Sequence, residues 1–450
     1  MNHRFYLLGS TVIAALGGLL FGFDASVING ATDALQRVFQ LSQAALGFTV
    51  ASALIGTIVG SILVGRPADR FGRRAMLVAI AVLYVVTSIG TALAWDWYSF
   101  LAFRLLGGLG IGAASVVSPM YIAEISPAQY RGRLVAVMQF NIVFGILLAY
   151  LSNYTIAQLG LGADEWRWMF GVMALPSAIF FGLLFLAPLG PRWLVSQNRL
   201  QEARAELSRL GTDSQSVERE IQDIQASLDL THHSLEETFF SKAYLKPILL
   251  VVAIAVFNQL SGINAVLLYA THIFEMAGAG KNAALLQGVV VSATNMVVTI
   301  SAMAVIDHFG RRKLMIVGSI GYILSLAAIA WAFYRFGTEF TRLGSVVVLA
   351  SLLVFIASHA FGQGAVIWVF ISEVFPNRVR ARGQALGSFT HWFMCGLIAW
   401  TFPVIAARSG GHAFAFYAAM MVLQLLWVLL VMPETKGVSL EEIQKKLGIE

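Results

Sequence analysis

The chain has 450 residues, of which 58% are hydrophobic and 12% are charged, and its formal net charge is +6. Soluble domains carry about 25% charged residues, so this composition excludes a soluble globular protein and predicts a membrane protein. The positive charge does not indicate a nucleic-acid partner, because basic residues gather where membrane topology places them. The single cysteine, Cys395, excludes an internal disulfide and has no cysteine partner for a metal site, so we expect neither a metal nor a cofactor.

Twelve apolar segments reach the roughly 20 residues that a helix needs to cross a bilayer. In chain order they lie at about 6–30, 44–65, 75–94, 99–119, 134–156, 168–187, 247–276, 282–306, 314–335, 344–374, 381–407 and 411–432. The first segment is of full length and lacks a small-residue cleavage site, which favours a first span over a cleaved signal peptide. We therefore expect an all-α, multi-pass protein embedded in the lipid bilayer.

A polar stretch at about 188–246 separates the sixth and seventh segments. Apolar residues recur at spacings of three and four in 200–210 and 216–228, which favours two short amphipathic helices over a disordered linker. Most of the 30 Lys and Arg residues lie in this stretch and in the loops that share its side of the membrane. Positive residues mark the cytoplasmic side, so both termini are expected to be cytoplasmic.

Two short motifs occur twice at matching positions. Asp69-Arg-Phe-Gly-Arg-Arg74 follows the second span and returns as Asp307-His-Phe-Gly-Arg-Arg312 after the eighth. Glu124-Ile-Ser-Pro127 follows the fourth span and returns as Glu373-Val-Phe-Pro376 after the tenth. The repeats predict two pseudo-symmetric six-helix halves, as in transporters built around a site at the midplane. The expected parts are an N-terminal half at 1–187, a cytoplasmic helical linker at 188–246, a C-terminal half at 247–432 and a cytoplasmic tail at 433–450.

One acid lies deep inside the first span. Asp24 has no basic neighbour in sequence, and a charge at this depth must face a partner or a wet cavity. Arg104 is the only basic residue placed well inside a span, so we expect the two to pair. An opposite charge favours the ionised acid while burial favours the protonated one, which suits a site for a proton. A helix-end acid at the membrane surface and a static pair that staples two spans are the alternatives.

The repeated motifs place arginines beside acids at the cytoplasmic ends of the spans. A loop arginine can pair with Glu124 or Glu373, and such pairs would tie helices together when the cytoplasmic side is closed. Topology alone explains the arginines but not the matched positions of acids and bases. The candidate gate residues are Asp69, Arg70, Arg73, Glu124, Arg131, Asp307, Arg311, Glu373 and Arg380.

Polar side chains gather in the seventh span. The amides of Asn258, Gln259 and Asn264 both donate and accept hydrogen bonds, which suits the hydroxyl groups of a sugar. Between them, Ser261-Gly262 is a place where the helix can break and face a cavity. Helix–helix contact is the alternative role for any single amide. Further interior candidates in other spans are Gln139, Asn141, Asn295, Trp368, His391 and Trp392.

These residues resemble those of a sugar porter of the major facilitator superfamily, of the bacterial proton-coupled type. The resemblance covers nearly the whole chain and rests on the motifs above together with Pro119-Met-Tyr-Ile-Ala-Glu-Ile-Ser-Pro127, Gln259-Leu-Ser-Gly-Ile-Asn264 and Pro433-Glu-Thr-Lys-Gly437. It implies a major facilitator fold, a proton-coupling pair of Asp24 and Arg104, and an outer gate at Tyr269. The sugar contacts that it implies are Gln139, Asn258, Gln259, Asn264, Asn295, Trp368 and Trp392, with Phe21 and Gly364 lining the same cavity.

Several positions depart from the family pattern. Asn258 stands where glutamine is usual, and His391 replaces an amide near the sugar. Ala365 replaces a frequent proline in the tenth span and is expected to stiffen that helix. The run Pro188-Leu-Gly-Pro-Arg192 lacks the family's glutamate, which removes one expected partner at the inner gate.

The function expected from these features is proton-coupled uptake of a monosaccharide, a hexose or pentose, by a monomer in the plasma (inner) membrane. The mechanism would be alternating access, with the proton as coupling ion. A facilitative sugar uniporter of the same fold is the nearest alternative, and a sugar sensor that does not transport is a second. An enzyme is not expected, because the sequence shows no nucleophile–base set and no metal cluster.

Overall fold

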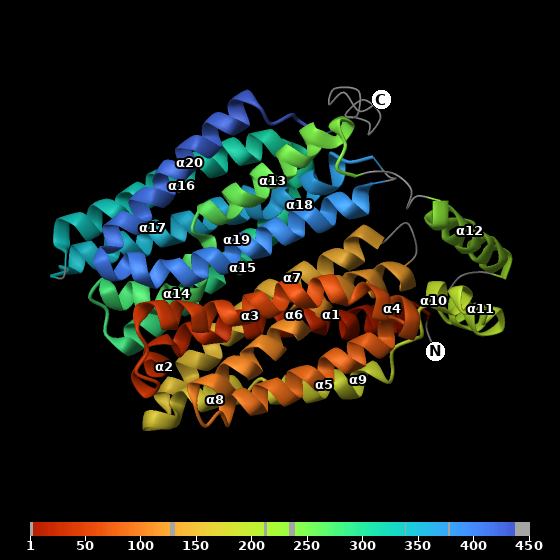
Figure 1. Ribbon diagram of the computed structural model, residues 1–450, viewed down its shortest axis with the longest axis horizontal. Helices are drawn as coiled ribbons and strands as arrows, with labels where there is room; N and C mark the ends of the chain where they lie inside the picture. The colour runs from red at the N-terminus through yellow and green to blue at the C-terminus, as the bar shows by residue number, and fades with distance from the viewer. Residues whose placement is uncertain are drawn as a thin grey trace. The chain divides into compact units, whose positions relative to one another are not determined.

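The computed structural model describes residues 3–126, 131–210, 214–233, 239–337, 339–376 and 379–436. These residues form helices and contain no strand (Figure 1). Up to the end of the linker, the helices are α1 (His3–Val27), η1 (Ile28–Gly30), α2 (Thr32–Val38), α3 (Gln43–Leu63), α4 (Gly65–Phe71), α5 (Arg73–Ala92), α6 (Trp97–Ile125), α7 (Arg131–Gln158), η2 (Gly162–Asp164), α8 (Glu165–Gly171), α9 (Ala174–Leu184), α10 (Pro191–Ser196), α11 (Leu200–Arg209) and α12 (Ser214–His233). The later helices are η4 (Lys242–Tyr244), α13 (Leu245–Leu260), α14 (Ile263–Met276), α15 (Lys281–Phe309), α16 (Arg311–Phe336), α17 (Arg342–Phe361), α18 (Gln363–Glu373), α19 (Arg380–Arg408) and α20 (Gly410–Leu430).

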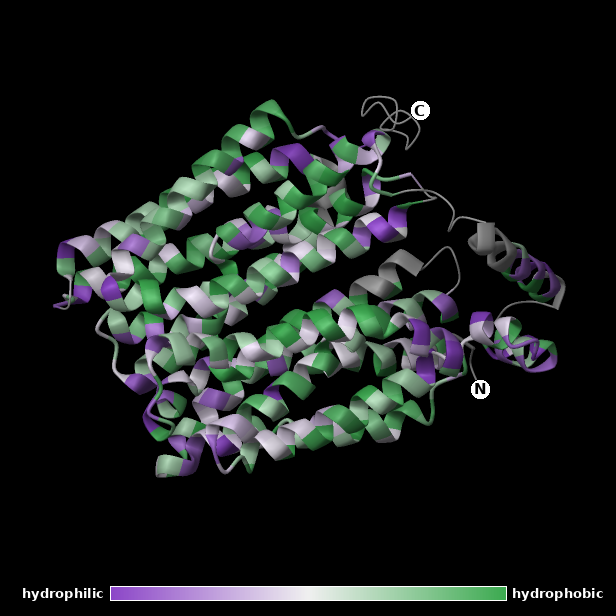
Figure 2. Cartoon of the chain, viewed as in Figure 1, coloured by the Kyte–Doolittle hydropathy of each residue, from purple (hydrophilic) through white to green (hydrophobic). Residues whose placement is uncertain are grey.

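Within this described part, 12 helical segments are long and apolar enough to cross a membrane, which confirms the predicted spans. The sixth span is divided into α8 and α9, the seventh into α13 and α14, and the tenth into α17 and α18. Figure 2 shows apolar residues along the long helices and polar residues at their ends and on α11 and α12.

The linker is helical, as its apolar periodicity predicts. Buried side chains of α10, α11 and α12 form a small core of their own, which includes Leu194, Leu207 and Ile221. Arg204 on α11 pairs with Glu218 on α12 at 2.5 Å. The amphipathic helices therefore bury their apolar faces against one another.

The chain divides into two compact units. Unit 1 comprises Met1–Val27, Ile55–Ala149 and Asp164–Glu236, and unit 2 comprises Ile28–Leu54, Tyr150–Ala163 and Glu237–Glu450. Unit 2 includes two segments of the predicted N-terminal half because η1 and α2 contact α14, and the Tyr150 hydroxyl donates to the Leu267 carbonyl at 2.5 Å. The predicted boundaries at 187 and 246 separate the two sequence repeats from the linker and do not follow these compact units. They remain a prediction.

Glycine allows close helix packing in unit 1. A Cβ atom at Gly56 on α3 would lie 2.1 Å from the Leu105 carbonyl oxygen, and one at Gly112 on α6 would lie 2.0 Å from the Thr57 carbonyl oxygen. Only a residue without a side chain allows backbones to approach this closely. The glycines that follow Arg104 therefore bring α3 against α6.

Two spans of unit 2 break at glycine. Gly262 has φ of +84° between α13 and α14, so the break predicted at Ser261-Gly262 is present. In the tenth span, Gly362 has φ of −88° and ψ of −102° between α17 and α18. The span is therefore divided despite the alanine at position 365, because Gly362 adopts a backbone conformation outside the helical region.

Candidate functional site

A buried ion pair joins α1 and α6 within unit 1. Arg104 Nη1 donates to Asp24 Oδ1 at 2.8 Å, and Arg104 Nη2 lies 3.3 Å from the Asp24 carbonyl oxygen. Arg104 is 2% exposed and Asp24 is 6% exposed. The guanidinium also lies 5.3 Å from the centre of the Phe170 ring. The structure thus pairs the two charges that the sequence places inside spans, and each compensates the other away from water.

The two oxygens of the Asp24 carboxylate have different surroundings. Oδ2 is buried and has no hydrogen-bond partner among the described residues, and the same holds for the hydroxyl of Tyr84 on α5. The two groups interact electrostatically. An oxygen without a donor can accept a proton while the other oxygen keeps its arginine. Tyr84 gives no signal in the sequence, because aromatic residues are common throughout the spans.

Three amides of the seventh span form a chain of hydrogen bonds in unit 2. Gln259 Nε2 donates to Asn258 Oδ1 at 2.9 Å, and Asn264 Nδ2 donates to Gln259 Oε1 at 2.7 Å. The break at Gly262 brings Asn264 back towards Gln259, and the Ser261 hydroxyl donates to the Asn258 carbonyl at 2.6 Å. Asn258 and Gln259 are buried, whereas Asn264 is partly exposed. The helix break therefore gathers the amides at one place.

Aromatic side chains of α18 and α19 extend this amide cluster. Gln259 Nε2 lies 3.3 Å from the ring nitrogens of His391. The His391 ring centre lies 5.1 Å from that of Trp368 and 5.0 Å from that of Trp392. Trp368 is 41% exposed, so part of its ring is open. Polar groups for hydroxyls and an apolar ring face for a sugar ring thus occur together.

The other predicted sugar contacts lie apart from this cluster or on the other unit. Asn295 on α15 is buried, and its Oδ1 lies 3.5 Å from the Thr299 hydroxyl. Gly364 on α18 lies over His359, since a Cβ there would be 3.1 Å from the His359 carbonyl oxygen. Phe21 on α1 is partly exposed and Gln139 on α7 is exposed, and both belong to unit 1.

Tyr269 lies at a kink near the C-terminal end of the seventh span. Its backbone leaves the helical region, with φ of −128° and ψ of 19°. Its hydroxyl donates to the Ala399 carbonyl at 2.8 Å, and its ring lies 5.2 Å from that of Phe402. Pro403 has no N–H for the Ala399 carbonyl, so Tyr269 supplies the missing donor. Pro403 was the sequence signal for this contact.

A second contact at this end involves residues that the sequence does not single out. Asn29 Nδ2 donates to the Thr271 hydroxyl at 2.9 Å, and the Thr271 N–H donates to Asn29 Oδ1 at 3.0 Å. Both residues are buried in unit 2. The two bonds attach η1 to α14 immediately after the kink at Tyr269.

Each unit has an arginine–glutamate pair at the repeated motifs. In unit 1, Arg73 Nε lies 2.7 Å from Glu124 Oε1, and Arg73 Nη2 lies 2.8 Å from Asp69 Oδ1. In unit 2, Arg311 Nη2 lies 2.8 Å from Glu373 Oε1. The matched acids and bases of the two motifs therefore meet within each unit.

The remaining gate candidates are less well connected. Arg70 is exposed and lies over the Phe71 ring at 5.3 Å. Arg380 Nε donates to the Phe375 carbonyl at 3.4 Å. The side chains of Arg131 and Asp307 lie outside the described part of the structure.

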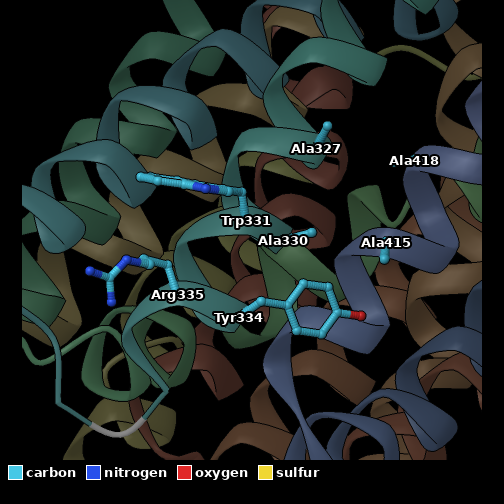
Figure 3. A pocket seen from close by; sticks show the side chains of 7 residues that line it. All are labelled: Ala327, Ala330, Trp331, Tyr334, Arg335, Ala415 and Ala418. Atoms are coloured by element: carbon cyan, nitrogen blue, oxygen red, sulfur yellow. The ribbon is translucent and has the colours of Figure 1, made fainter.

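A surface groove lies away from these residues. It is an open groove of about 540 Å³ between α16 and α20, lined by Ala327, Ala330, Trp331, Tyr334, Arg335, Ala415 and Ala418. Figure 3 shows Tyr334 pointing towards Ala415, while Trp331 and Arg335 project from the other side of α16. The groove has no amide and is open to the surface, so the polar cluster remains the better candidate site.

Comparison with known proteins identifies close relatives. Residues 10–447 match the family model described as "Sugar (and other) transporter". The D-xylose-proton symporter of Escherichia coli (strain K12) is 37% identical over 98% of this chain and 95% of its own length. The arabinose-proton symporter of Bacillus subtilis (strain 168) is 34% identical over 96% of this chain and 93% of its own length.

Solved structures agree with these relatives. The inward-open conformation of the xylose transporter XylE from E. coli matches with a TM-score of 0.86 at 35% identity, over 98% of this chain and 100% of that one. XylE bound to 6-bromo-6-deoxy-D-glucose, described as a major facilitator superfamily proton:xylose symporter, matches with a TM-score of 0.79 at 36% identity, over 99% and 100% of the two chains. The predicted all-α fold with 12 candidate spans is confirmed.

Proposed function

Because the chain belongs to the sugar transporter family, we propose that it is a proton–monosaccharide symporter that works by alternating access. Two relatives are named for the pentoses D-xylose and arabinose, and XylE has been solved with a glucose derivative bound, so the proposed substrate is a pentose or a hexose. The protein acts as a monomer in the inner membrane with both termini in the cytoplasm, and the proton is its only coupling ion.

The environment of Asp24 is the observation that supports the proposed proton coupling. One of its oxygens accepts from Arg104, and the other is buried without a partner among the described residues. Adding a proton to Asp24 removes the negative charge that Arg104 neutralises, so the pair weakens and α1 is released from α6. A proton moves the conformational equilibrium only by binding one state better than another.

Sugar recognition is assigned to the amide and aromatic cluster of unit 2. Gln259 lies at its centre, because it bonds to Asn258 and Asn264 and lies beside His391. A sugar hydroxyl can replace one of these internal bonds without leaving the amide unpaired. Trp368 and Trp392 supply apolar ring faces, and the arginine–glutamate pairs of each unit serve as the inner gate.

The test is sugar uptake by proteoliposomes, with and without an inward proton gradient, over a panel of pentoses, hexoses and polyols. The unmodified protein is expected to accumulate sugar only with the gradient. Asp24→Asn should abolish accumulation but retain exchange between two sugar-filled sides, because the amide keeps the shape without binding the proton. Accumulation by Asp24→Asn would refute the coupling role, and gradient-independent uptake by the unmodified protein would indicate a uniporter.

A further inference from the structure

Three titratable side chains meet at the outer end of the seventh span, away from the proposed transport site. Asp33 lies on α2, whereas His272 and Glu275 lie three residues apart on one face of α14. His272 Nδ1 is 3.2 Å from Asp33 Oδ1. One ring nitrogen of His272 and one carboxylate oxygen from each acid lie within 4.8 Å of one another. All three are partly buried within unit 2.

Other charged groups face this cluster. Arg37 on α2 acts electrostatically on both acids, and Lys281 at the start of α15 acts on Glu275. The two acids and these two bases line a cavity of about 90 Å³, which is room for roughly three water molecules. Protons can therefore reach the cluster through water.

The two acids are close enough to share a proton. Carboxylate oxygens of Asp33 and Glu275 lie within 4.8 Å of each other at a partly buried site, and two like charges at this distance disfavour the ionisation of both, so the pair favours one shared proton. Burial opposes ionisation of Asp33, but hydrogen bonds from His272 and Glu275 outweigh this and hold the pKa of Asp33 below its usual range. Asp33 is thus the ionised acceptor of the cluster, and the proton shared by the two acids lies on Glu275.

We propose that Asp33, His272 and Glu275 form a second proton-binding site, which latches α2 to α14 while the outer side of the transporter is closed. The proposal rests on the proposed alternating-access function, and it assigns the separation of α2 from α14 to the step that opens the outer side. The Asn29–Thr271 bonds lie beside the latch and would open with it.

The sign of the pH effect follows from the proton count. Once separated in water, carboxyl groups titrate at about pH 4 and hold no proton at neutral pH. The closed latch holds at least one, so closing takes up a proton from the outer side. Acid on the outer side therefore favours the closed state, by up to about tenfold per pH unit for one proton. The proton returns to the same side on opening, so this site regulates the cycle without adding to proton transport.

A divalent cation is the competing occupant, because a histidine and two carboxylates are suitable ligands. The positive charges of Arg37 and Lys281 face the same acids and oppose a second cation. The three side chains are therefore better suited to a proton than to a metal ion.

The experiment measures opening of the outer side without any transport. Spin labels at Trp95→Cys and Leu343→Cys, two exposed positions, are introduced after Cys395→Ala has removed the native thiol. Double electron–electron resonance in nanodiscs then gives the distance distribution from mildly acidic to mildly alkaline pH. The long-distance population is expected to rise with pH, by up to about tenfold per pH unit.

Variants identify the group that titrates. Glu275→Gln should stay closed at every pH, because its amide still donates to Asp33 and cannot lose the proton. Asp33→Ala should stay open at every pH, because the acceptor is gone. The matched control is Glu339→Gln, an exposed acid outside the cluster, which should titrate as the unmodified protein does.

Several outcomes would overturn the latch. These are a pH-independent distance distribution, a titration that survives in Glu275→Gln, and a response abolished by a chelator, which would indicate a bound metal. Loss of the response in Asp24→Asn would assign it to the transport pair instead. If Asp24→Asn still accumulates sugar while the pH response persists, the coupling role fails and the latch stands.

Discussion

Unit 1 and unit 2 use different polar chemistry inside their spans. Unit 1 has a buried ion pair inside its spans, Asp24 with Arg104, and unit 2 has a cluster of amides with the imidazole of His391. A charge pair changes its energy when a proton binds, whereas neutral amides are nearly indifferent to protons but match hydroxyl groups. Under the proposed function, this difference makes coupling and recognition separable, so a mutation can affect one and spare the other.

The inner ends of the two units show a closer correspondence with one clear difference. Arg74 donates to the carbonyls of Leu184 and Phe185, as Arg312 does to those of Val428 and Leu429. Unit 2 adds a carboxylate at the start of α16.

That carboxylate is Glu434, whose oxygens accept from the N–H groups of Arg311 at 2.9 Å and Arg312 at 3.1 Å. In unit 1, Leu189, whose side chain has no hydrogen-bonding group, stands at the matching place in sequence. The inner network of unit 2 therefore has a bond that unit 1 lacks.

The largest expected effect comes from breaking the charge pair of unit 1. Arg104→Met leaves Asp24 buried without its partner, which should lower the free energy of unfolding by about 3–5 kcal/mol. Thermal unfolding in detergent measures the loss. The double variant Asp24→Leu with Arg104→Met should recover most of it, because no charge is then left unpaired. A double variant as unstable as the single one would contradict the pairing argument.

The matching change in unit 2 should affect binding more than stability. Gln259→Ala removes the central amide, which should weaken sugar binding at least tenfold while costing about 1–3 kcal/mol of stability. Calorimetric titration with the sugar identified by uptake measures the affinity. Gln424→Ala is the matched control, because this amide on α20 is also buried in unit 2, donates to the Ser319 hydroxyl at 2.8 Å and is not among the predicted sugar contacts. Unchanged affinity in Gln259→Ala would move the sugar site elsewhere.

A smaller effect should distinguish the inner ends of the two units. Glu434→Ala removes the cap of α16 and should cost about 1–2 kcal/mol. Glu218→Ala, which breaks an exposed linker pair, should cost less because surface pairs contribute little. Equal melting temperatures for the two variants would show that the Glu434 cap does not stabilise unit 2.

The smallest effect concerns the acid at the outer end of unit 2. The pKa of Asp33 is lowered in the folded protein, so its ionised form stabilises the fold above the ordinary carboxyl value of 3.8. This contribution is lost as pH falls through the lower folded-state pKa. The unmodified protein should therefore be more stable than Asp33→Asn at neutral pH, and the difference should shrink at strongly acid pH. A difference that is constant with pH in thermal unfolding would contradict an ionised Asp33.

Much of this organisation could be predicted from the sequence, because it depends on residue types and spacings within short stretches of the chain. Asp24 and Arg104 are conspicuous because charges are rare inside apolar spans, and that rarity led to their pairing. The break at Gly262 was predictable because glycine interrupts a polar run of the seventh span. The break at Gly362 was not expected, since the missing proline at position 365 was the stronger local signal.

The sequence by itself determined the 12 spans, the repeated motifs and the residue types available to the site, because hydropathy and spacing are local properties. Only the tertiary structure decided which side chains meet. It placed Tyr269 on the carbonyl freed by Pro403, Glu434 at the start of α16 and Asp33 beside His272. These contacts join residues more than a hundred positions apart, and buried polar groups find such partners only when the helices pack.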